Sequence, residues 1–203
     1  MIIGKWNKSV ILTYVGLAFA VAGMVLSFAF EKANFGICCL MMAGICDLFD
    51  GSVARMCKRD ELEKAFGIEL DSLVDVMSFI ALPIALSVSM GYTSIWFILV
   101  YIIFGMSGIA RLAYFNLETA ETDGPVRFYT GLPVTYTALI IPVVYLLSVC
   151  VDGIIFQIVY AATLVIIAVL GVLRVSVVKP RGVAYICFGL LAIALLVLYL
   201  AVL

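Results

Sequence analysis

The sequence predicts an all-α, polytopic membrane helix bundle, and three observations support this prediction. Of its 203 residues, 66% are hydrophobic and 12% are charged, whereas soluble domains average roughly 45–50% apolar and 25% charged residues. Seven apolar stretches come close to the length of about 20 residues that crosses a bilayer as a helix. The stretches lack an alternation of period two, and within lipid only helices and closed barrels satisfy the backbone hydrogen bonds.

The apolar stretches predict about seven transmembrane helices, with about six to eight as the range. They cover residues 9–30, 34–55, 68–90, 93–115, 131–151, 154–173 and 182–203. Short polar connections separate them, and the chain length suits a single integral-membrane domain over residues 1–203. The first stretch is longer than the apolar region of a cleaved signal peptide, so we expect it to be the first membrane helix.

The basic residues predict the orientation, because cytoplasmic loops carry an excess of Lys and Arg. With the N-terminus in the cytoplasm, eleven of the twelve basic residues fall on the inner side, and only Lys32 falls outside. We therefore expect a multi-pass protein of the cell (inner) membrane. The net charge of −1 gives no indication of a nucleic-acid partner. Histidine, the commonest general base and metal ligand, is absent.

Four aspartates flank one inner loop, and carboxylates in membrane helices are costly enough to indicate a functional site. Asp47 and Asp50 lie near the inner end of the second predicted helix, and Asp71 and Asp75 lie near the start of the third. Spacings of three and four place each pair on one helix face. Because the connecting loop is short, we expect the helices to be antiparallel neighbours whose carboxylates converge.

Two glycines and an arginine share these faces. Gly51 follows the first aspartate pair, and Gly67 precedes the second pair by one turn. A glycine leaves room for a bulky ligand to approach the backbone. Arg55, one turn beyond Gly51, is suited to holding phosphate oxygens.

The carboxylate cluster predicts a divalent metal site. Four carboxylates without a His or Cys among them favour Mg²⁺ or Mn²⁺, with Ca²⁺ as a further possibility. Two such ions, about 3.5–4 Å apart, would clamp a diphosphate and stabilise the leaving oxygen. In the alternative reading, the aspartates face water or pair with nearby basic residues. Four aspartates at face-sharing spacings, with glycines between them, favour the metal site.

The complete string resembles the signature of the CDP-alcohol phosphotransferases, a family that makes phospholipids from CDP-linked lipids. It reads Asp47-x2-Asp50-Gly51-x2-Ala54-Arg55, then Gly67-x3-Asp71-x3-Asp75. Within the family, three further strings resemble the bacterial and archaeal type of phosphatidylserine synthase. They are Leu70–Phe79, Arg111–Asn116 and Phe128–Val134.

Two features depart from the family pattern. Eleven residues separate Arg55 from Gly67, where the family usually has eight, and the extra residues lie where the nucleotide would sit. Asp60 and Glu63 have the spacing of a capping box, so we expect the third helix to begin early. The first helix has no match to the family's asparagine near its cytoplasmic end, and Thr13 is the nearest polar residue.

The resemblance implies a role for each motif residue. The metal ligands would be Asp47, Asp50, Asp71 and Asp75, and Asp75 would also be the general base. The CDP group would lie against Asp47, Gly51, Ala54, Arg55, Gly67 and Asp71. Arg111 and Arg127 are the candidates for binding the acceptor or a lipid phosphate. The implied cofactors are two Mg²⁺ or Mn²⁺ ions.

The resemblance also implies substrates and partners, with two alternatives left open. The donor would be CDP-diacylglycerol, the favoured acceptor a small polar alcohol, serine, and the assembly a homodimer in the lipid bilayer. Glycerol 3-phosphate, an inositol phosphate or choline would be the acceptor in an alternative with the same chemistry. In a more remote alternative the protein is an ion-coupled transporter, a class that typically shows broken helices or inverted repeats.

Overall fold

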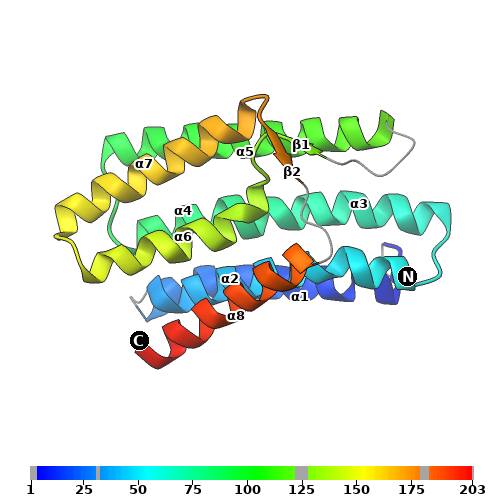
Figure 1. Ribbon diagram of the computed structural model, residues 1–203, viewed down its shortest axis with the longest axis horizontal. Helices are drawn as coiled ribbons and strands as arrows, with labels where there is room; N and C mark the ends of the chain where they lie inside the picture. Colours follow the sequence, from blue (N-terminus) through cyan, green and yellow to red (C-terminus); the bar gives the residue numbers. More distant parts are fainter. Residues whose placement is uncertain (1–3, 31–32, 122–127, 179–182, 203) are drawn as a thin grey trace.

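The computed structural model describes residues 4–30, 33–121, 128–178 and 183–202, and these form a bundle of seven helical rods (Figure 1). The first rod is α1 (Ile11–Ala29), preceded by the turn η1 (Lys8–Val10), and the second is α2 (Ala33–Met56). The third rod is continuous and consists of α3 (Glu61–Asp75), η2 (Val76–Ala81) and α4 (Leu82–Ser89). The fourth rod is α5 (Ile95–Glu121). The last three are α6 (Thr137–Leu146) between the turns η3 (Val134–Tyr136) and η4 (Leu147–Val149), then α7 (Gly153–Val172) and α8 (Val183–Val202).

The helical architecture and the number of about seven helices confirm the prediction from the sequence. Within the described residues, five rods are long and apolar enough to cross a membrane. They are Lys8–Ala29, Ala33–Met56, Glu61–Ser89, Ile95–Glu118 and Gly153–Val172. The rod around α6, Val134–Val149, and the segment Gly189–Tyr199 of α8 are apolar but shorter.

A short strand pair was not predicted. β1 (Phe128–Thr130) pairs antiparallel with β2 (Ser176–Val178), with Tyr129 opposite Val177. Three residues are too few for alternation to be recognisable in a sequence, because a strand pattern needs about four to eight residues. The pair joins the segment before α6 to the segment after α7.

The third rod begins earlier than its apolar stretch, as the capping box predicted. Asp60 accepts a hydrogen bond from the backbone N–H of Glu63, and the Glu63 carboxylate accepts one from the backbone N–H of Asp60. This reciprocal cap satisfies two backbone donors that a helix start leaves unpaired. The helix therefore begins at Glu61, more than two turns before the first aspartate of the pair that it carries.

The same rod contains a π-helical segment, η2, directly after Asp75. Its last bond runs from the N–H of Leu82 to the carbonyl of Met77, five residues earlier. Pro83 follows and has no N–H, so it cannot bond the carbonyl of Phe79 as an α-helix requires. The Thr137 hydroxyl of α6 lies 3.3 Å from that carbonyl oxygen and 2.6 Å from that of Val134. The proline explains why the helix widens here.

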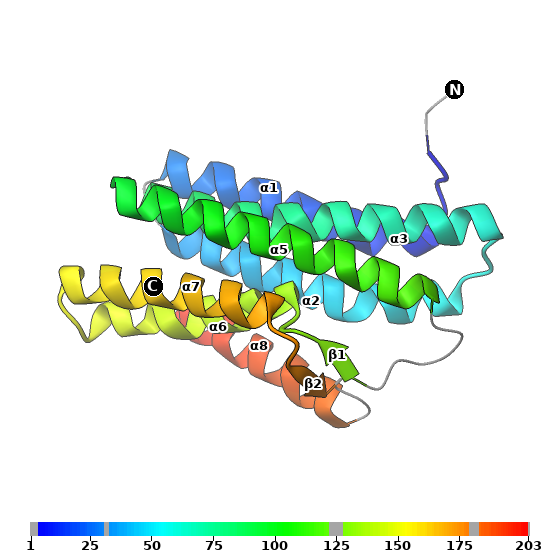
Figure 2. The ribbon, with the colours of Figure 1, turned by 90° about the horizontal axis from the view of Figure 1, so that it is seen from above.

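The rods lie side by side along the long axis of the molecule (Figures 1 and 2). α1 packs along α2, α5 packs along α7, and α6 contacts α2, α7 and α8. Large side chains such as Leu40, Phe79 and Leu164 are fully buried between them. The start of α1, the α2–α3 connection and the end of α5 share one end of the bundle (Figure 1). This end carries the aspartates.

Candidate metal centre and substrate cavity

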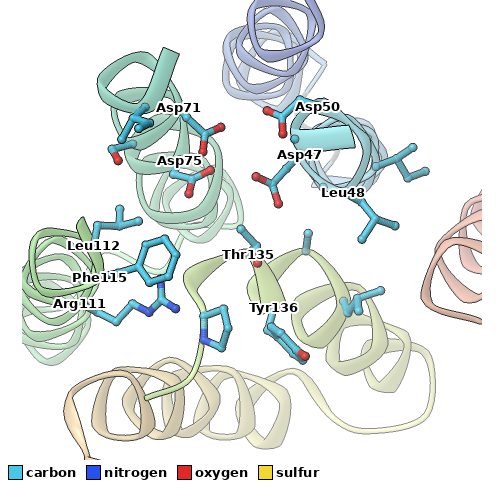
Figure 3. A pocket seen from close by; sticks show the side chains of 18 of the residues that line it. Asp47, Leu48, Asp50, Asp71, Asp75, Arg111, Leu112, Phe115, Thr135 and Tyr136 are labelled. Carbon is cyan, nitrogen blue, oxygen red and sulfur yellow. The ribbon is translucent and has the colours of Figure 1, made fainter. Parts of the chain in front are cut away.

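The four aspartates come together, as the helical spacing predicted. Asp47 and Asp50 project from α2 toward Asp71 and Asp75 on α3 (Figure 3). One carboxylate oxygen from each of Asp47, Asp71 and Asp75 lies within 4.8 Å of the other two. Asp50 and Asp75 are both 8% exposed, so two of the carboxylates are almost removed from solvent.

The helices leave space around the carboxylates, because α2 packs against the far part of the third rod (η2 and α4). α1 contacts both α2 and α3 and so holds the two helices in position. From α1, the buried Thr13 hydroxyl donates a hydrogen bond of 3.1 Å to Asp50 Oδ2. Thr13, the nearest polar residue to the position of the family's asparagine, therefore contacts the cluster directly.

The aspartates line a cavity of about 350 Å³. Its lining includes α2 through Gly51 and Arg55, and η3 through Thr135 and Tyr136. α5 closes the side opposite α2 with Arg111 and Phe115 (Figure 3). The cavity has the size of a small-molecule site, since such sites measure about 300–1,000 Å³.

Arg111 is the basic residue of the cavity wall that is most deeply buried. It is 6% exposed, and its guanidinium carbon lies 5.0 Å from the centre of the Phe115 ring. Its side chain points into the cavity toward the side that carries Asp75 (Figure 3). Arg127, the other predicted acceptor residue, lies outside the described residues.

A polar pair links the third rod to α5 beside the aspartates. The Asn116 amide donates a hydrogen bond of 2.8 Å to Ser72 Oγ, and Ser72 Oγ lies 3.2 Å from Asn116 Oδ1. Both residues line the cavity. Both residues belong to strings that carry the family resemblance, but their separation of 44 positions does not predict that they meet.

The two glycines of the motif have space around them in the protein itself. A methyl group added at Gly51 would lie 3.6 Å from Arg55 Nη1, and one added at Gly67 would lie 3.7 Å from Arg59 Nη1. Both are ordinary van der Waals distances. By contrast, a methyl group at Gly44 would lie 2.6 Å from Ala138 Cβ. Packing therefore explains Gly44, but it does not explain Gly51 or Gly67.

Only some of the residues predicted to contact CDP line the cavity. Gly51 and Arg55 line the cavity, together with Asp47 and Asp71. Ala54 and Gly67 are not among the residues of its lining. Arg55 is exposed, and its guanidinium donates a hydrogen bond of 3.0 Å to Ser52 Oγ.

The donor set fits a hard divalent cation. The three clustered ligand groups are all carboxylates, and the described lining of the cavity includes neither a His nor a Cys. Oxygen-only ligand sets favour Mg²⁺, Mn²⁺ or Ca²⁺ over zinc or copper. Three carboxylates within 4.8 Å of one another also repel each other, and a cation would remove that repulsion.

The chain is similar in sequence to known proteins. A family model described as CDP-alcohol phosphatidyltransferase matches residues 6–202. Over 122 residues the chain is 35% identical to CDP-diacylglycerol–serine O-phosphatidyltransferase of Saccharomyces cerevisiae. The matched region covers 57% of the chain and 42% of the relative. Over 111 residues it is 36% identical to archaetidylserine synthase of Methanothermobacter thermautotrophicus, with 53% and 44% covered.

A third relative comes from a bacterium. The chain is 32% identical over 131 residues to CDP-diacylglycerol–serine O-phosphatidyltransferase of Helicobacter pylori. The matched region covers 62% of the chain and 53% of the relative. The chain therefore matches about half the length of these curated relatives. All three names describe transfer to serine or synthesis of a serine lipid.

Proposed function

Because the chain belongs to the CDP-alcohol phosphatidyltransferase family, we propose that it transfers the phosphatidyl group of CDP-diacylglycerol to the hydroxyl of L-serine. The products are phosphatidylserine and CMP. The observation that carries the proposal is the convergence of Asp47, Asp71 and Asp75 on a cavity with Arg111 in its wall. The names of the three relatives support serine as the acceptor.

Asp75 is the proposed general base. Its carboxylate accepts the proton of the acceptor hydroxyl, and the acceptor oxygen forms a bond to the phosphorus that carries the diacylglycerol. The bond from that phosphorus to the oxygen bridging the two phosphates breaks, and CMP leaves with the electron pair. Asp75 suits this role because it is 8% exposed and lies beside the cavity, where little water competes for the acceptor.

Asp47, Asp71 and Asp75 would hold a divalent cation, and Asp50 would contribute to a second one. When bound, such ions supply positive charge against the negative charge that develops on the diphosphate oxygens. The Thr13 hydrogen bond fixes one oxygen of Asp50 and so orients its carboxylate toward Asp71. Mg²⁺ and Mn²⁺ are the expected ions.

Arg111 is the proposed site for the carboxylate of serine. A buried guanidinium in a cavity wall offers two parallel N–H donors to a carboxylate, and Phe115 holds the guanidinium plane from one side. For Arg111→Gln we expect the KM for serine to rise about 10- to 100-fold, because a hydrogen bond to a charged group contributes about 1.5–3 kcal/mol. The KM for CDP-diacylglycerol should stay within about twofold, since the acceptor alone loses a contact.

Steady-state kinetics with each substrate varied in turn measures this split. Arg174→Gln is the matched control, because Arg174 is exposed and lies outside the cavity lining. A rise in the KM for CDP-diacylglycerol alone would assign Arg111 to the lipid phosphate and remove it from the serine site.

Gly51 and Gly67 are the proposed points where the donor nucleotide approaches the helix backbones. For Gly51→Ala and Gly67→Ala we expect the KM for CDP-diacylglycerol to rise about tenfold or more, since even a small loss of fit in a tight site costs about 1–3 kcal/mol. The melting temperature should stay constant or rise, because Ala in a helix interior is about 0.5–1 kcal/mol more favourable than Gly.

Gly105→Ala is the control for this pair, since Gly105 lies in α5 and, apart from the adjacent backbone of that helix, no atom lies within 4 Å of an added methyl group. It should be as stable as the other two variants and retain full donor affinity. A loss of stability in Gly51→Ala or Gly67→Ala that parallels the loss of affinity would show that the glycines serve packing instead.

The proposed location is the inner membrane, with the aspartate cluster at the cytoplasmic face. The support is that the segment before α1 and the α2–α3 connection, which carry Lys5, Lys58 and Arg59, lie at the end of the bundle that carries the cluster (Figure 1). We further propose that residues 1–203 form a single membrane domain. The homodimer remains a prediction from the family resemblance.

An acceptor panel tests the proposed function. Purified protein receives CDP-diacylglycerol, Mn²⁺ or Mg²⁺, and one of serine, glycerol 3-phosphate, inositol phosphate or choline, and CMP release is measured. Serine should release CMP well above the rate without an acceptor. Release with another alcohol instead would keep the chemistry and change the substrate, and release with none of them would refute the enzyme assignment.

A further inference from the structure

The connection between α2 and α3 is longer than the family pattern and is held in a defined position. The Asn7 side chain, from the segment before α1, donates hydrogen bonds of 3.1 Å to the carbonyl of Lys58 and 3.0 Å to Glu63 Oε2. The capping box fixes the other end of the connection at Asp60. The N-terminal segment and the start of α3 therefore clamp the residue between them, Arg59.

Arg59 reaches back over α3. Its Nη1 atom lies 3.7 Å from the position of a methyl group at Gly67, and the residue is half-buried. No hydrogen bond or ion pair of Arg59 is found among the described residues.

The acidic residues that follow Arg59 in the sequence have other partners. Asp60 accepts from the N–H of Glu63 and lies 3.9 Å from Lys5 Nζ. Glu61 accepts from Lys64 at 2.7 Å. Glu63 accepts from Asn7 and from the backbone N–H of Asp60. The half-buried guanidinium of Arg59 thus lies over Gly67 and has no carboxylate partner among the described residues.

The position mirrors that of Arg55. Arg55 Nη1 lies 3.6 Å from the methyl position of Gly51, which follows Asp50. Arg59 takes the same place over Gly67, which precedes Asp71 by one helical turn. Two guanidiniums therefore lie over the two motif glycines that packing does not explain, and of these Arg55 lines the cavity whereas Arg59 lies outside its lining.

We propose that Arg59 is a second anion-binding residue for the diphosphate of the nucleotide donor, supplied by the lengthened connection. This inference rests on the proposed function. A guanidinium can donate two parallel hydrogen bonds to phosphate oxygens, whereas a lysine ammonium group acts as a point charge. Arg59 and Arg55 then hold the nucleoside diphosphate from opposite sides, while the aspartates act on its phosphates through bound cations.

Binding of CDP to the full chain in detergent with Mn²⁺, measured by calorimetry, tests Arg59. Arg59→Ala should weaken CDP binding about tenfold or more, and Arg59→Lys should restore only part of it. Lys58→Ala, which removes an adjacent exposed positive charge, should stay within about twofold of the unaltered protein. Far-ultraviolet circular dichroism and the melting temperature verify that each variant is folded.

The outcomes separate the two proposals. If the unaltered protein binds CDP and Arg59→Ala binds it as Lys58→Ala does, the inference about Arg59 is wrong and the proposed function stands. If Arg59→Lys binds as tightly as the unaltered protein, charge alone suffices and the bidentate role is wrong. If the unaltered protein does not bind CDP, the proposed function fails, and the role of Arg59 fails with it.

Discussion

Asp75→Asn should lower kcat by about 10²- to 10⁴-fold, the range that a general base contributes. The amide has nearly the shape of the carboxylate but cannot accept the proton of the acceptor hydroxyl. The donor lies mainly against Asp47, Asp71 and the glycine faces in the proposed arrangement, so CDP binding should be retained in large part. Turnover with serine and CDP binding by calorimetry measure the two effects separately.

Asp152→Asn is the matched control for this substitution. Asp152 is exposed, precedes α7 and makes no side-chain cap to that helix, so both activity and binding should be unchanged. If Asp75→Asn lost CDP binding and turnover together, Asp75 would be primarily a metal ligand. The proton would then be accepted by another group.

Removal of divalent cations should abolish activity and destabilise the protein. One oxygen from each of three carboxylates lies within 4.8 Å of the other two, and a bound cation would relieve their mutual repulsion. A ligand at a hundred times its dissociation constant stabilises the folded state by about 2.7 kcal/mol. For a chain of this size, that corresponds to a rise in melting temperature of roughly 5–10 °C.

The melting temperature and CMP release are measured after treatment with a chelator and again after addition of Mg²⁺ or Mn²⁺. Asp71→Asn removes a shared ligand and should eliminate most of the thermal shift, whereas Asp152→Asn should retain it. Activity that survives complete chelation would contradict a metal-dependent mechanism. A thermal shift that persists in Asp71→Asn would place the binding site elsewhere.

The aspartate cluster could be predicted from the sequence because its information is local. Spacings of three and four on two helices determine which side chains share a face, and one short connection makes those helices antiparallel. The early start of α3 followed from Asp60 and Glu63 for the same reason. Family resemblance then added the CDP group, which no spacing could provide.

The rest of the site depends on contacts between distant segments. Hydrogen bonds from Thr13 to Asp50 and between Ser72 and Asn116 join residues 37 and 44 positions apart, and helix periodicity does not encode such pairs. The π-helical segment was not predicted, and the carbonyl that Pro83 leaves unpaired is bonded by Thr137 of another rod, a contact that helix periodicity does not encode. The strand pair was missed because each strand has only three residues.

One measurement tests the central claim, that the aspartates of α2 and α3 form the metal centre at which the CDP-lipid reacts. It is the anomalous scattering of Mn²⁺ in crystals of the protein grown with CDP-diacylglycerol. The account predicts anomalous density between the carboxylates of Asp47, Asp71 and Asp75, with the donor diphosphate in contact with it. Density that is absent from this cluster, or a diphosphate bound at another place on the protein, would contradict the account.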